Sequence, residues 1–240
     1  MKTTKQLVLV TLLIISSSFA IAQTNTLDAQ TNLNQIGTLT PNTVGALGFD
    51  NRYEGVKGSP FLFEEWIPCE IYLENGTEYK EGLKLNYNAE NDEIHLLSPN
   101  KTVRILYSTQ IKKFVATGNS GAALFVRFKP TELGLKEGRE LFCEVLYDGE
   151  TKLVKKTNVI YKKANYEGAY AQGKTYDEYQ KTDKLYIKTK NGYEKIGLSK
   201  GAVMKLFPEK KSELKGYFKK LGKGIDTEKE LVEALIFIES

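Results

Sequence analysis

Three Asx-Gly pairs, each between two stretches of alternating polar and apolar residues, constrain the fold of this 240-residue chain most strongly. Asn75-Gly76 lies inside Ile67–Tyr87, Asp148-Gly149 follows the stretch ELFCEVLY, and Asn191-Gly192 follows KLYIKTK. Such pairs favour type I′ turns, because both turn residues need a positive φ and the twist of the turn then matches the flanking strands. The sequence therefore predicts a repeated antiparallel hairpin.

The hairpin over Ile67–Tyr87 predicts one buried face. Apolar residues alternate with polar ones on both sides of its turn, which is the period of a half-buried strand. We expect the inward face to consist of Ile67, Cys69, Ile71, Leu73, Leu83, Leu85 and Tyr87.

Short strands joined by polar turns continue beyond this hairpin. Besides the strands around Asp148-Gly149, they are predicted over residues 93–97, 102–107, 111–117, 122–129, 184–189 and 193–198. Connections this short favour antiparallel pairing of neighbours in the chain. A set of about ten strands tends to curl or fold over, so we expect a mainly β fold: an antiparallel meander forming a sandwich-like or open-barrel sheet over residues 50–198.

The last segment, residues 199–240, changes to a helical period. Ser199 can cap a short helix, and the apolar residues of the next one follow Pro208 at helical spacing. Thr227 and Glu230 form the two ends of a capping box before a final helix. The sequence therefore predicts a small C-terminal helical segment.

The first residues resemble a targeting signal rather than part of the fold. Residues 1–22 combine Lys2 and Lys5, a short apolar run and an Ala20-Ile21-Ala22 cleavage site, as in a secretory signal peptide. Residues 23–49 are rich in Thr, Asn and Gln without a sustained period, which predicts a flexible tether. We therefore expect an exported protein, located in the periplasm, on the cell surface or in the medium.

Lysines concentrate near the C-terminus, although the whole chain carries a formal net charge of only +4. An anionic surface could bind the lysines Lys210, Lys211, Lys215, Lys219 and Lys220. The segment Lys184–Gly224 contains no Arg, and lysines on an amphipathic helix more often form a solvated face. The candidate partners are an envelope polysaccharide, an anionic lipid or another envelope protein, and nucleic acid is disfavoured.

Four tyrosines lie in the connection over residues 162–183: Tyr166, Tyr170, Tyr176 and Tyr179. A long connection without regular structure is often functional, and tyrosine rings can stack on sugars or bases. This segment is thus the predicted ligand surface. The alternative is a crossover whose rings cover the end of the sheet.

Residue types that carry catalysis or bind metals are sparse. His95 is the sole histidine and falls on the polar face of its predicted strand, so we predict no catalytic residue, metal site or cofactor. The acid pairs Glu64-Glu65 and Asp92-Glu93 do not indicate glycoside hydrolysis, because adjacent residues on a strand point to opposite faces.

Cys69 and Cys143, the two cysteines, both fall on apolar faces of predicted strands. In an exported protein they could form a disulfide, which needs Cα atoms within about 7 Å. Two separate buried thiols are the alternative.

The stretch RYEGVKGSP, the strand LKLNYN followed by DEIHLL, and the Lys-rich helical tail resemble a family of uncharacterised exported β-rich proteins of Gram-negative bacteria. The resemblance spans most of residues 50–240. It implies a periplasmic or cell-surface setting, but the family has no assigned activity and supplies no functional residues. Together these features predict an exported non-catalytic binding or envelope-structural protein. The alternative is a lipid carrier or carbohydrate-active enzyme, with a cleft between the sheet and the Tyr-rich connection.

Overall fold

The computed structural model describes residues 54–97, 101–106, 108–119, 121–165 and 173–240, which all fall within the compact unit formed by residues 51–240. The predicted signal peptide and tether, residues 1–22 and 23–49, lie outside the described residues.

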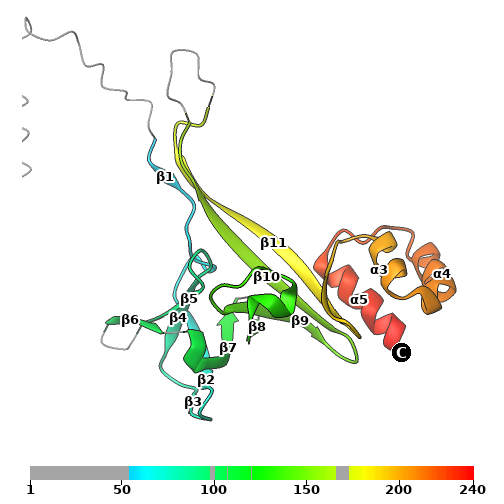
Figure 1. Ribbon diagram of the computed structural model, residues 1–240, viewed down its shortest axis with the longest axis horizontal. Coiled ribbons are helices and arrows are strands. Elements are labelled where there is room, and N and C mark those ends of the chain that lie inside the picture. The colour runs from blue at the N-terminus through cyan, green and yellow to red at the C-terminus, as the bar shows by residue number, and fades with distance from the viewer. Residues whose placement is uncertain (1–53, 98–100, 107, 120, 166–172) are drawn as a thin grey trace, which may run out of the picture. The chain divides into compact units, whose positions relative to one another are not determined.

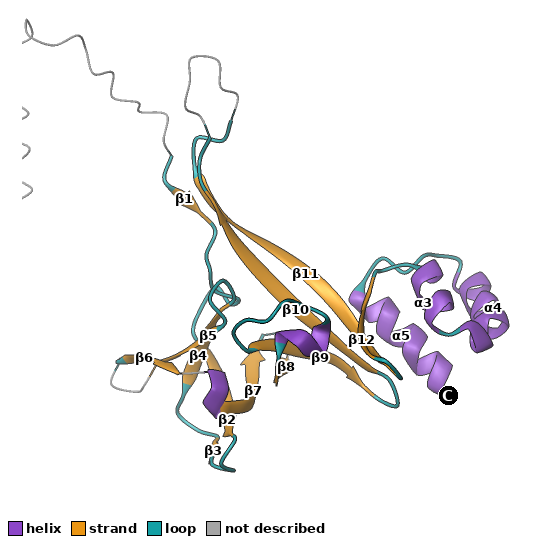
Figure 2. Cartoon of the chain, in the orientation of Figure 1, coloured by secondary structure: helices purple, strands orange, loops and turns teal. Residues whose placement is uncertain are grey.

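The described chain is mainly β, with helices at its C-terminal end (Figures 1 and 2). The strands are β1 (Val56–Lys57), β2 (Ile67–Leu73), β3 (Glu78–Tyr79), β4 (Lys84–Asn88), β5 (Glu93–Leu97), β6 (Val103–Leu106), β7 (Ile111–Gly118), β8 (Gly121–Phe128), β9 (Leu141–Asp148), β10 (Lys152–Lys162), β11 (Asp177–Thr189) and β12 (Gly192–Ile196). The helices are α3 (Lys200–Leu206), α4 (Lys211–Leu221) and α5 (Glu228–Glu239), and the 3₁₀ turns are η1 (Ser108–Gln110), η2 (Pro130–Leu133) and η3 (Pro208–Lys210).

The twelve described strands form a single mixed sheet in the order β1-β11-β10-β9-β8-β7-β2-β4-β5-β6, with β12 paired to β11 and β3 paired to β2. The prediction of a mainly β fold with C-terminal helices is confirmed. The predicted antiparallel meander is only partly right, because β1 pairs with β11 in parallel and β2 pairs with three strands.

Strand β2 divides its pairing along its length. Its first residues pair with β4, where Ile67 lies opposite Leu85, and the register from Cys69 onward pairs with β7. The predicted hairpin partner, β4, therefore pairs only with the start of β2. The rest of β2 joins β7 on one side and the two-residue strand β3 on the other.

The Asx-Gly pairs do connect antiparallel strands, but the predicted type I′ geometry is wrong. Gly76 has φ +85° and Gly192 has φ +115°, whereas neither Asn75 nor Asn191 has a positive φ. The Asn75 side chain accepts a hydrogen bond from the backbone N–H of Thr77 at 3.0 Å, which stabilises the turn while Asn75 itself keeps a negative φ.

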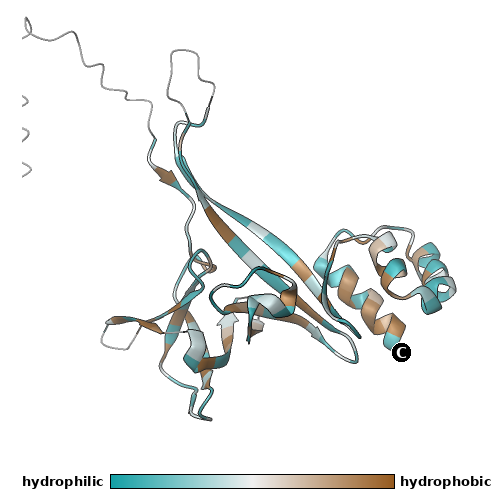
Figure 3. Ribbon diagram, in the orientation of Figure 1, coloured by the Kyte–Doolittle hydropathy of each residue, from teal (hydrophilic) through white to brown (hydrophobic). Residues whose placement is uncertain are grey.

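The inward face predicted for the first hairpin is confirmed. Cys69, Ile71, Leu85 and Tyr87 are buried in one cluster, against which Ile67, Leu73 and Leu83 pack. Phe114 of β7 is fully buried in this cluster and stacks on Phe125 of β8 with ring centroids 4.6 Å apart. Figure 3 shows apolar residues recurring along these strands and along α5.

The C-terminal helices form as predicted and share a second cluster with the sheet. The Ser199 hydroxyl caps α3 by accepting from the N–H of Ala202, and Thr227 and Glu230 form the predicted capping box of α5. Leu214 of α4 and Leu231 of α5 are buried together with Leu153 and Ile187 of the sheet. The apolar faces of these helices are thus buried against β10–β12.

The connection predicted over residues 162–183 is shorter than expected. Strand β11 begins at Asp177, and residues 178–183 continue the ladder with β10, in which Tyr179 lies opposite Tyr161. The alternation that reveals a half-buried strand is missing here, because Lys181, Thr182 and Asp183 are all exposed.

Candidate functional site

An apolar pocket of about 340 Å³ lies beside β2. This strand pairs with β4 at its start and with β7 and β3 further along. The lining residues of the pocket come from β2, β3, the residue before β4, β5, β6 and the junction of η1 with β7: Ile71, Leu73, Tyr79, Leu83, Leu96, Arg104, Leu106, Gln110 and Ile111. Most are aliphatic, and Ile71 and Ile111 are buried. The pocket is therefore an open hollow, with its floor in the core and with Tyr79, Arg104 and Gln110 exposed among its lining residues.

Strand register brings these residues together from distant parts of the chain. Leu73 lies opposite Ile111, and Ile71 lies opposite Tyr79, so both pairs share one face of β2 with its neighbours. On the other side, Leu96 of β5 lies opposite Arg104 of β6. Leu106 is two residues beyond Arg104 and so faces the same way.

The η1 side of the pocket is held by a partly buried arginine. Arg127 of β8 donates to the backbone carbonyl of Ser108 at 3.3 Å and to that of Thr109, and it also pairs with Glu74 and Glu140. These contacts fix the turn that carries Gln110 and leads into Ile111. The rim at this point is therefore a fixed part of the fold.

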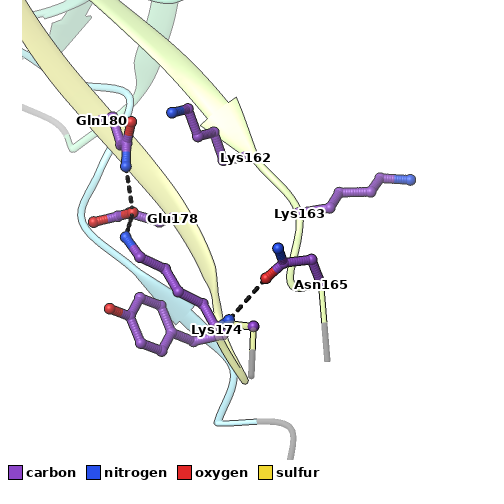
Figure 4. Close-up of a pocket in the computed structure, with 8 residues that line it drawn as sticks. Lys162, Lys163, Asn165, Lys174, Glu178 and Gln180 are labelled. Carbon is purple, nitrogen blue, oxygen red and sulfur yellow. Dashed lines mark hydrogen bonds and ion pairs between the residues drawn. The ribbon is translucent and has the colours of Figure 1, made fainter. Parts of the chain in front are cut away.

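A second cavity, of about 370 Å³, lies at the far end of the β10–β11 ribbon and is polar (Figure 4). It is lined by Lys162, Lys163, Asn165, Gly173, Lys174, Tyr176, Glu178 and Gln180. Several of these groups satisfy one another. Lys174 pairs with Glu178, whose pKa it lowers, and Gln180 donates to the same carboxylate at 2.7 Å.

The tyrosines predicted as a ligand surface do not form one group. Tyr176 lines the polar cavity, and Lys57 lies 3.6 Å from the centre of its ring. Tyr179 packs against Tyr161, with ring centroids 5.0 Å apart, and against the main core. Tyr166 and Tyr170 lie outside the described residues. Of the two tyrosines that the structure describes, Tyr176 thus has a lysine ammonium over its ring, and Tyr179 covers the sheet as in the alternative interpretation.

The lysines predicted to meet an anionic surface stand on and just before α4. Lys210 pairs with Glu213 at 3.3 Å. Within the described part of the chain, the other four have no ion-pair partner and are exposed: Lys211, Lys215, Lys219 and Lys220. Because the apolar face of α4 is buried, these lysines offer charge without an apolar surface that could enter a membrane.

Asp92 and Glu93 contact different partners, although only Glu93 belongs to β5 and Asp92 lies in the preceding turn with φ +54°. Glu93 lies 3.5 Å from His95 and 3.4 Å from Arg139. Asp92 instead accepts from the Tyr87 hydroxyl and lies 3.5 Å from the buried Lys156 ammonium. Burial raises the pKa of the Asp92 carboxyl, while Lys156 opposes that shift.

Both cysteines are free, buried thiols, so the structure contains no Cys69–Cys143 disulfide. Cys69 belongs to the main core, and Cys143 belongs to a separate cluster with Phe128, Leu141 and Val154. Burial raises the pKa of each thiol to about 12.

No group of three or more potential metal-ligating side chains occurs in the ranges that the structure describes. Over the same ranges, none of the helices combines the length and the apolar character needed to cross a bilayer.

The sequence did not reveal the pocket. Of the lining residues, Ile71, Leu73 and Leu83 were predicted as core, and Arg104 within the stretch VRIL is an ordinary strand residue. Only the divided pairing of β2 leaves space between them. Comparison with protein-family models, curated proteins and solved structures finds no match for this chain, so the resemblance to exported Gram-negative proteins stays a prediction.

Proposed function

We propose that this chain is an exported binding protein that holds a small apolar ligand, such as an acyl chain, in the pocket between β2 and β6. The observation that carries the proposal is the pocket itself, whose aliphatic walls belong to the sheet core. Its volume of about 340 Å³ lies within the range of small-molecule sites, which are mostly apolar with a few polar groups. Residues 1–22, with the features of a signal peptide, support export.

The size of the pocket sets the affinity expected for a simple ligand. Small ligands gain between about 0.3 and 1.5 kcal/mol for each non-hydrogen atom, with the lower values for larger ligands. A chain of about twelve such atoms at about 0.5 kcal/mol each would bind with a Kd of tens of micromolar. This affinity suits a carrier that must release its ligand.

Fluorescence of the neutral apolar probe N-phenyl-1-naphthylamine, titrated with the purified protein, tests the proposal. We expect saturable enhancement at one site. Leu83→Trp should abolish most of it, because Leu83 lines the pocket just before β4 and the larger ring would fill the space.

Leu198→Trp is the matched control, since Leu198 is 38% exposed and lies outside the pocket. Thermal unfolding should first show that both variants are folded. If the wild-type protein does not enhance the fluorescence, or if both variants bind like the wild type, the proposed function is wrong.

A further inference from the structure

Among the residues that the structure describes, Arg104 is the only charged one that lines the apolar pocket. It extends from β6 on the same face as Leu106, and its cross-strand neighbour is Leu96, which also lines the pocket. A guanidinium is therefore held beside a set of aliphatic side chains by the register of an antiparallel pair.

The other arginines that the structure describes have acidic partners, and Arg104 does not. Arg127 pairs with Glu74 and Glu140, and Arg139 lies 3.4 Å from Glu93. The Arg104 side chain makes no hydrogen bond or ion pair with any residue that the structure describes. Its exposed guanidinium thus has no acidic partner among the described residues, and its planar fork of donors is the geometry that carboxylates and phosphates match.

We propose that the ligand of this pocket is an anionic amphiphile, with its apolar tail among the aliphatic side chains and its carboxylate or phosphate head on Arg104. This inference rests on the proposed function and adds the chemical class of the ligand. Gln110, from η1, adds an amide hydrogen-bond donor to the lining of the pocket. The rest of the lining gives the tail only apolar contacts and the Tyr79 ring.

Displacement of N-phenyl-1-naphthylamine by three ligands with the same tail tests the head group: decanoate, monodecyl phosphate and decan-1-ol. At low salt, at least one anion should bind about fivefold more tightly than the alcohol, as expected for an exposed ion pair. The better anion identifies the head. Raising the salt from about 0.05 M to 0.5 M should remove most of the preference, because exposed charges are screened.

Arg104→Gln should lose the preference for the anion over decan-1-ol. Arg139→Gln is the control, because it removes an exposed arginine that does not line the pocket. If both anions bind no better than decan-1-ol in the wild type, or if Arg104→Gln keeps the preference, the inference is wrong while the pocket remains a binding site. If the neutral probe does not bind at all, the proposed function fails first.

Discussion

Replacement of Lys156 with Met should destabilise the protein by about 3 kcal/mol, because it leaves the Asp92 carboxylate buried without its cation. The Lys156 and Asp92 side chains are only 8% and 18% exposed, and their charged atoms lie 3.5 Å apart. Removal of one partner from a buried pair costs about 3–5 kcal/mol. We expect the lower end, since the Tyr87 hydroxyl still donates to Asp92.

Thermal unfolding measures this loss as a decrease in Tm. For a domain of this length, about 3 kcal/mol corresponds to roughly 6–12 °C. The double variant Lys156→Met/Asp92→Asn should recover most of the loss, because it removes both charges. Asn also tolerates the φ of +54° at position 92. Lys152→Met is the control on the same strand, where an exposed pair with Asp148 should cost less than about 1 kcal/mol.

The deficit should also depend on pH. Burial holds the pKa of Asp92 above its ordinary value, and loss of Lys156 raises it further. A carboxyl with a raised pKa in the folded state favours folding below the pKa of the unfolded chain, about 3.9, and this contribution is lost as pH rises through the folded value. Lys156→Met should therefore lose less stability at pH 4.5 than at pH 7. A single variant as stable as the wild type at pH 7 would refute the reasoning.

Three further predictions concern the core, a helix cap and the thiols. Phe114→Ala should cost about 3–5 kcal/mol in urea unfolding, because the ring is fully buried and stacks on Phe125; a cost below about 1 kcal/mol would contradict the packing. Thr227→Ala should cost about 1 kcal/mol and Thr227→Ser less, since only alanine removes the acceptor at the start of α5; equal losses would contradict the cap. In the reduced native protein at pH 8, Cys69 and Cys143 should not react with a disulfide reagent until denaturant is added, because burial holds the pKa of each near 12; rapid native labelling would contradict this.

Local sequence signals predicted much of the fold. Alternation from Ile67 to Leu73 identified the buried face of β2, and Ser199 and Thr227 identified two helix starts, because each depends on residues close in the chain. The pairing of β1 with β11 was not predictable. This pairing covers only two residues of each strand, beginning with Val56 opposite Asp177, and so short a segment has no periodic pattern of its own.

The candidate site was less predictable than the fold. Sequence reasoning placed function at tyrosines and lysines, which are conspicuous by composition. The pocket instead depends on which part of β2 pairs with β4 and which part pairs with β7. This long-range choice decides that Leu73, Leu96 and Arg104 line one cavity, and none of them is unusual for a strand.

The most direct test of the pocket is a methyl-resolved NMR titration of the purified protein with decanoate. Binding in the pocket predicts shifts at Ile71, Leu83, Leu96, Leu106 and Ile111, which line it. The leucine methyls of the helical cluster, such as those of Leu214 and Leu231, should stay unchanged. Shifts centred on the helical cluster, or no shifts at millimolar decanoate, would contradict the claim that this pocket binds the ligand.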